Sequence, residues 1–164
     1  MIRSAVFSPC GRYRYELRRT WNAALPVLVA IGLNPSRADA HVDDPTIRKE
    51  IGFATRWGFG GVIKVNMFGL ISTDPKGIAP AVDPIGPEND ATIDRVIAES
   101  NGWPLVAWGS HAAVRCARGE AMRRRFSGVA WCIGTTKDGN PRHTLRAGYV
   151  TPRETFVLRA RPSP

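Results

Sequence analysis

Cysteine is scarce in this 164-residue chain, and its placement argues against several kinds of site. The three cysteines, Cys10, Cys116 and Cys132, are odd in number and widely spaced. Such a set supports neither a disulfide framework nor a four-cysteine zinc or iron–sulfur site. Reduced thiols in a cytoplasm are the simplest interpretation, so we expect a cytoplasmic protein without a metal centre.

Long apolar runs and the common cofactor motifs are also missing. No stretch approaches the roughly 20 apolar residues of a membrane-spanning helix, and no apolar segment follows a basic start, so we expect neither a membrane partner nor a signal peptide. The absence of Gly-x-Gly-x-x-Gly and of a P-loop disfavours dinucleotide-dependent redox and phosphoryl transfer. With 43% hydrophobic residues the chain suits one folded domain over residues 1–164, which we expect to be monomeric and free of cofactors.

Acidic residues are few relative to basic ones. Lys plus Arg number 23 against 14 Asp plus Glu, which gives a net charge of +9. This balance favours binding to nucleic acid or another polyanion, and most of the excess is arginine, which binds phosphate with a two-pronged fork. Arg123 and Arg124 belong to a basic cluster that predicts either phosphate contacts or a solvated helix face. A GC-rich genome that encodes arginine often is the alternative explanation of the charge.

Apolar runs alternate with helical patterns along the chain. Alternation over Arg12–Trp21 predicts a half-exposed edge strand, and Asp44 followed by Pro45 predicts the start of a helix. Strand–helix–strand alternation is typical of right-handed parallel units. We therefore predict a three-layer α/β/α sandwich with a four-stranded parallel central sheet and an N-terminal antiparallel edge strand. The four parallel strands are expected at Pro26–Gly32, Gly61–Val65, Pro104–Trp108 and Val129–Ile133, and the other helices near Pro87 and from Ser110.

Distinctive residues follow each predicted parallel strand. Ligands of open parallel sheets bind beyond the carboxyl ends of the strands, so side chains from these segments should converge on one pocket. Polar groups gathered there suit a small molecule or a nucleic-acid base. The segments are Gly32–Ser36, Asn66–Phe68, Trp108–Ser110 and Gly139–His143.

Eight motifs in a fixed order resemble the bacterial domain-of-unknown-function family numbered 1643, over nearly the whole chain. That resemblance implies a family but no activity. The motifs are Gly32–Ser36, Asp43–Thr46, Trp57–Gly61, Val65–Phe68, Thr73–Pro75, Gly86–Asp90, Ala107–Gly109 and His143.

A more distant resemblance is to the uracil-DNA glycosylases. Gly32-Leu-Asn34-Pro35 is similar to their first-strand motif, Asn66 ends an apolar strand as theirs does, and Trp108-Gly-Ser110 and His143 follow in the same order. The resemblance implies a glycosylase-like α/β domain that hydrolyses the N-glycosidic bond of an extruded or modified base in DNA or a nucleotide. It implies no metal and no cofactor.

The resemblance also implies roles for individual residues. His143 would donate to the base oxygen where negative charge develops, and Asn34 would hold the attacking water without being able to accept its proton. On that reasoning Asn34→Asp should raise activity by adding a proton acceptor. Asn66 would read the base edge, and Phe68 or Phe53 would stack on the base. The substrate-binding set is completed by Pro35, Ser36 and Asp43.

Two departures from the glycosylase pattern keep other functions open. The loop His143-Thr-Leu145-Arg146 replaces a His-Pro-Ser-like segment, although Leu145 could wedge into DNA and Arg142 and Arg146 could bind phosphates. Three acids, Asp39, Asp43 and Asp44, follow the first parallel strand and favour an amine, a cation or a modified base as ligand. The alternatives are a non-catalytic nucleic-acid or nucleotide binding module, and a small-molecule hydrolase or transferase.

Overall fold

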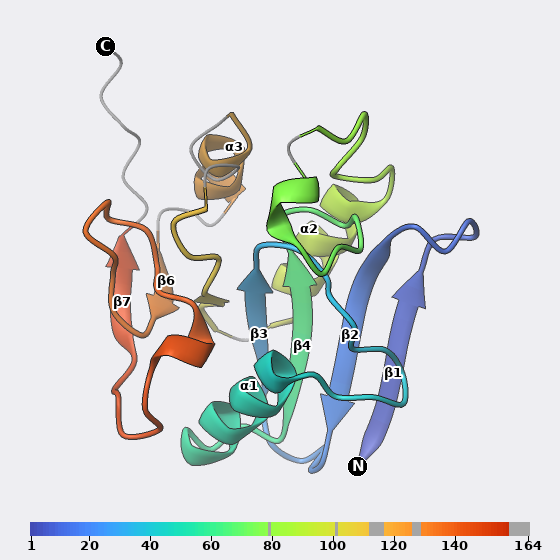
Figure 1. The fold of residues 1–164 in the computed structure, drawn as a ribbon. Helices are drawn as coiled ribbons and strands as arrows, with labels where there is room; N and C mark the ends of the chain where they lie inside the picture. Colours follow the sequence, from blue (N-terminus) through green and yellow to red (C-terminus); the bar gives the residue numbers. More distant parts are fainter. Residues whose placement is uncertain (79, 101, 112–116, 126–128, 158–164) are drawn as a thin grey trace.

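The computed structural model describes the chain except for residues 79, 101, 112–116, 126–128 and 158–164. One mixed sheet organises the described part, in the order β1-β2-β4-β3-β5-β6-β7 (Figure 1). Its strands are β1 (Ile2–Phe7), β2 (Arg14–Thr20), β3 (Val27–Gly32), β4 (Gly61–Asn66), β5 (Leu105–Val106), β6 (Val129–Cys132) and β7 (Glu154–Val157). The helices are α1 (Pro45–Arg56), α2 (Asn89–Glu99) and α3 (Ala117–Arg125), with short 3-10 turns η1 (Pro75–Gly77) and η3 (Thr144–Arg146).

The centre of the sheet is parallel, as the apolar runs predict, but the sheet is wider than expected. The pairs β3–β4, β3–β5 and β5–β6 are parallel, whereas β1–β2, β2–β4 and β6–β7 are antiparallel. The expected single antiparallel edge strand is therefore corrected to three antiparallel strands. Most residues of β1 and β7 are exposed, which is why no buried-strand pattern marks these two strands.

β2 is an interior strand rather than the predicted edge strand. It lies between β1 and β4, so the face that was expected to be half-exposed is covered. Arg14, Glu16 and Arg19 are all buried on it. Buried charges need partners, and Glu16 pairs with Arg18 and Arg95 while Arg19 pairs with an acid of the loop between β3 and α1.

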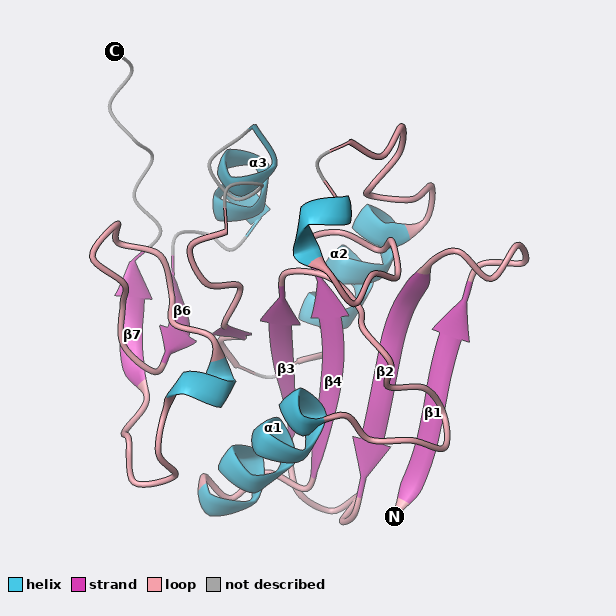
Figure 2. Ribbon diagram, in the orientation of Figure 1, coloured by secondary structure: helices cyan, strands magenta, loops and turns pink. Residues whose placement is uncertain are grey.

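Helices cover both faces of the sheet, as expected for a three-layer sandwich (Figure 2). On one face α1 packs Ile47 and Phe53 against inward side chains of β3 and β4. On the other face α2 and α3 contribute Ile93, Val96 and Met122 to a second core. Alternate residues of β3 and β4 serve the two cores, which fixes the register of both strands.

The start of α1 is set by local chemistry that the sequence predicts. The Asp44 carboxylate accepts a hydrogen bond from the backbone N–H of Ile47 at 2.9 Å, and Pro45 occupies the first helical position. Gly58, with a φ of 81°, ends the segment in a conformation that favours glycine. α3 continues through Gly119, and the helix start predicted at Ser110 runs into residues outside the described part. No described helix is long and apolar enough to cross a membrane.

Candidate functional site

The candidate site lies where the chain direction across the sheet reverses. From β3 the chain passes through α1 to β4 on one side, and from β4 it passes through α2 to β5 on the other side of β3. The loops that follow β3 and β5 therefore diverge and leave a crevice at the carboxyl edge of the parallel strands, the usual ligand position in such sheets.

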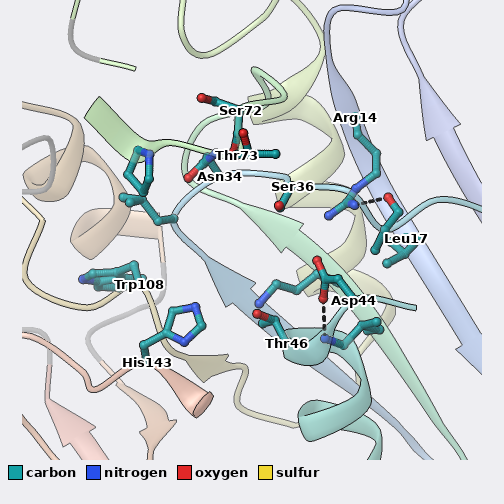
Figure 3. A pocket seen from close by; sticks show the side chains of 15 residues that line it. Arg14, Leu17, Asn34, Ser36, Asp44, Thr46, Ser72, Thr73, Trp108 and His143 are labelled. Atoms are coloured by element: carbon teal, nitrogen blue, oxygen red, sulfur yellow. Dashed lines mark hydrogen bonds between the residues drawn. The ribbon is translucent and has the colours of Figure 1, made fainter. Parts of the chain in front are cut away.

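A small, partly open cavity of ≈ 170 Å³ occupies this crevice (Figure 3). Figure 3 shows His143 and Trp108 on one side of it, Asn34 and Ser72 above, and Arg14 on the side opposite His143. The remaining lining mixes small polar and apolar groups. These are Leu17, Leu33, Ser36, Ala38, Asp44, Thr46, Ile47, Lys64, Thr73 and Pro75.

A wider, more open groove of ≈ 810 Å³ adjoins the cavity. His143 and Trp108 line both spaces, so they stand at the junction between them. Two arginines lie along the groove, and among the described residues that line it none is acidic. The groove-lining residues are Leu33, Pro75, Trp108, Gly109, Ser110, His111, Thr136, Arg142, His143, Leu145 and Arg146.

Asn34 is held with its amide in one orientation. Its Nδ2 donates to the backbone oxygens of Pro35, at 2.9 Å, and of Ser72, at 2.7 Å. Both N–H groups are therefore engaged, and the Oδ1 atom is left as the functional end of the side chain. The structure thus brings Asn34 to the cavity as a hydrogen-bond acceptor.

His143 is held as a neutral imidazole. Burial, together with the positive charges of Lys64 and Arg146, lowers its pKa to about 4. Its Nδ1 accepts the backbone N–H of Leu145 at 3.3 Å, so the single ring proton of the neutral form belongs on Nε2. His143 can therefore donate one hydrogen bond without carrying a charge.

A buried ion pair lies beside these two residues. The Lys64 Nζ and the Glu50 Oε1 are 2.5 Å apart, and the Thr144 hydroxyl donates to the same oxygen at 3.4 Å. Burial raises the pKa of Glu50, and the charge of Lys64 opposes that rise. The pair ties α1, β4 and η3 together directly behind the cavity wall.

Five residues predicted to bind the substrate lie outside the cavity lining, namely Asn66, Phe53, Phe68, Pro35 and Asp43. Asn66 is buried beside β3, with both side-chain amide atoms unpartnered among the described residues. A Cβ added to Gly32 would come within 2.8 Å of the Asn66 Oδ1, so the glycine permits this close packing. Phe53 packs on Trp57 in the α1 core and Phe68 belongs to the opposite core, so neither ring is available here to stack on a base.

The acidic loop is mostly occupied with structure. Asp43 pairs with Arg3 at 3.0 Å and with the buried Arg19 at 2.7 Å, so it anchors the loop to β1 and β2 instead of facing a ligand. The Asp39 carboxylate accepts two backbone N–H groups of the same loop, which lowers its pKa. Asp44 both caps α1 and lines the cavity.

The other predicted residues divide between the cavity, the groove and the surface. Pro35 is buried next to Asn34, and Ser36 lines the cavity. Arg142, Leu145 and Arg146 line the groove, and Arg142 also donates to a backbone oxygen within its own loop. On α3, the Arg124 side chain is 78% exposed, outside both lining sets, and the side chain of Arg123 lies outside the described residues.

Arg14, Glu50 and Lys64 are site residues that sequence reasoning missed. All three are charged and buried. One signal was present: Lys64 interrupts the otherwise apolar run Gly61–Val65, where a charge requires a buried partner. Nothing local in the sequence identifies Glu50 as that partner.

The fold and the site together define an α/β protein with a small polar cavity and an adjoining basic groove at the carboxyl edge of its sheet. The chain belongs to the family described as "Protein of unknown function (DUF1643)", whose model matches residues 14–145. No curated protein and no solved structure matches the chain significantly.

Proposed function

We propose that the protein is a base glycosylase-like hydrolase that cleaves the N-glycosidic bond of an extruded or modified base in DNA or a nucleotide. The observation that carries the proposal is that Asn34 and the neutral His143 line one base-sized cavity. Glycosidic cleavage leaves a departing base anion and a cationic sugar. The enzyme therefore needs a hydrogen-bond donor at the base and a water held at the sugar.

His143 supplies the donor in this proposal. Its Nε2–H can donate to a base oxygen as negative charge develops there, and the Leu145 N–H bond keeps the ring in the required tautomer. The hydrogen bond from a neutral N–H to the base oxygen becomes stronger as that oxygen gains negative charge. Its effect is therefore concentrated in the transition state. The charge of Lys64, which helps to keep His143 neutral, also favours a nearby anion.

Asn34 supplies the contact to water. Its amide nitrogen is fixed by two backbone oxygens, so Oδ1 can accept a hydrogen bond from a water molecule and hold it in place. An amide does not accept a proton at neutral pH, so the sugar cation must draw the water in. We therefore expect slow base release.

The sizes of the cavity and the groove suit a ligand whose base and sugar–phosphate chain occupy separate spaces. The cavity of ≈ 170 Å³ is smaller than the roughly 300–1,000 Å³ of pockets for drug-sized ligands, and it suits a base without its sugar and phosphate. The groove, with Arg142 and Arg146, suits the sugar–phosphate chain that would remain outside.

A binding module without catalysis is the second candidate, and the amide of Asn34 favours it because no carboxylate stands at that position. A panel of single-stranded and duplex oligonucleotides with natural and modified bases separates the two. The proposal predicts abasic sites with the wild-type protein and with His41→Ala, an exposed histidine outside the cavity, but not with His143→Ala. Binding without abasic sites for every base would favour the module.

A further inference from the structure

The small cavity has on its walls a cation, Arg14, and an anion, Asp44, between which no ion pair forms. Arg14 enters from β2 and is 3% exposed. It donates to the backbone oxygen of Ala38, while its buried Nε has no partner. Asp44 contributes a carboxylate at the start of α1, one oxygen of which accepts the Ile47 N–H. Within the described part of the chain, neither charge belongs to an ion pair.

A buried guanidinium without a carboxylate partner is costly. The other buried cation of the cavity, by contrast, has such a partner. Lys64, on the same cavity wall, is paired with Glu50 at 2.5 Å. Burial lowers the pKa of Arg14 to about 10, while the negative charge of Asp44 raises it. Asp44 is therefore close enough to act on Arg14 through space. The gap between the two side chains is part of the cavity (Figure 3).

We infer that this cavity selects a base that carries an exocyclic amine beside a ring acceptor, with Asp44 accepting from the amine and Arg14 donating to the acceptor. The inference rests on the proposed function and names its class of base. An ionised carboxylate only accepts and a guanidinium only donates. Together they match the edge of cytosine or adenine, and carboxylate–amine and arginine–acceptor contacts are established ways to read such edges.

Uracil and hypoxanthine lack this edge. Uracil presents a carbonyl oxygen where cytosine has its amine, and that oxygen would face the Asp44 carboxylate. Hypoxanthine likewise presents a carbonyl oxygen where adenine has its amine, and that oxygen would also face the carboxylate. In both cases a desolvated acceptor stays unsatisfied, so these bases should bind more weakly.

The direction of the cavity fits the proposed chemistry. Arg14 lies on the side opposite His143 (Figure 3). A base whose glycosidic side faces His143 therefore turns its far edge toward Arg14 and Asp44. One bound orientation then serves both recognition and bond cleavage.

Asp44→Asn is the decisive variant because it separates recognition from folding. Asparagine caps helices about as well as aspartate, so the bond to Ile47 is kept while the charge is lost. Asp83→Asn is the matched control. Its carboxylate also accepts backbone N–H groups, from Ile85 and Gly86, but it lies outside the cavity lining.

The experiment measures binding of single-stranded trinucleotides whose central base is cytosine, uracil, adenine or hypoxanthine, with the same samples scored for abasic sites. We expect the wild type and Asp83→Asn to prefer cytosine over uracil and adenine over hypoxanthine by roughly tenfold or more. Asp44→Asn should lose this preference while it remains folded, which thermal unfolding of the same sample checks.

Two results would overturn the inference. Abasic sites formed with no amine preference, or a preference that survives in Asp44→Asn, would remove it and leave the proposed function standing. Absence of binding to all four trinucleotides would remove the inference, whereas the proposed function falls only if the panel of natural and modified oligonucleotides also yields no abasic sites.

Discussion

Asn34→Asp replaces the side-chain amide of Asn34 by a carboxylate. The structure predicts that this change lowers stability and does not raise activity. The sequence suggests that a carboxylate here would add a proton acceptor and raise activity. The Asn34 Nδ2, however, donates to the backbone oxygens of Pro35 and Ser72 at 2.9 and 2.7 Å. A carboxylate in the same place would set oxygen against oxygen at both contacts.

The size of the effect follows from those two contacts. Each lost hydrogen bond that leaves a shielded acceptor unpaired costs about 1–3 kcal/mol, so we expect a loss of about 2–4 kcal/mol at neutral pH. Protonation would restore one donor and about half of that loss. The introduced carboxyl should therefore have a folded-state pKa raised by about 1 unit, since one unit corresponds to about 1.4 kcal/mol.

Urea unfolding of Asn34→Asp and of the wild type between pH 3.5 and 8 tests this reasoning. A raised folded-state pKa means that the folded form holds its proton more tightly than the unfolded form. The destabilisation should then be smallest below the unfolded pKa of about 4, grow as pH rises toward the folded pKa, and level off above it. Base release should not increase. Equal stability of the two proteins at pH 7, or a loss that does not depend on pH, would refute the account of Asn34.

Three further predictions concern charge. Because the pKa of His143 is lowered to about 4, the unfolded state binds more protons than the folded state between about pH 6.5 and 4. The urea-unfolding free energy of the wild type should therefore fall as pH drops through that window. In His143→Asn this free energy should depend less on pH. Asp43→Asn should destabilise the fold by about 3 kcal/mol in urea unfolding, since it leaves the buried Arg19 without its anion; a change below about 1 kcal/mol would contradict that role. Replacing Arg142 or Arg146 with alanine should each reduce the salt slope of oligonucleotide binding by about 1, and an unchanged slope would exclude a phosphate contact.

The parallel centre of the sheet was predictable because each of its strands is buried. A strand covered on both faces has a continuous apolar run, and the predicted runs from Pro26, Gly61, Pro104 and Val129 each overlap one of the four parallel strands. The edge strands β1 and β7 bury few side chains, so their sequences carry no such signal. β2 was misplaced because its inward charges resemble an exposed face until their partners are known.

The site residues that could be predicted are those whose place in the fold follows from the strand order alone. Asn34 and His143 follow parallel strands, so topology brings them together before any side-chain detail is considered. Arg14 and Glu50 could not be found in this way, because a charged residue is expected at the surface unless a distant partner is known. The stacking role of Phe53 could not be judged from the sequence for a related reason. A phenylalanine at this position fits a core as well as a stacking surface, and only its packing in the structure distinguishes the two.

The most direct test of the account is the single-turnover rate of base release by the wild type and His143→Ala on the best substrate of the panel, with binding measured in parallel. The account predicts that loss of the His143 donor slows release by roughly 10²–10³ while the dissociation constant changes little, because the donor acts on charge that develops in the transition state. Equal rates for the two proteins would contradict it. So would a loss that lies entirely in binding.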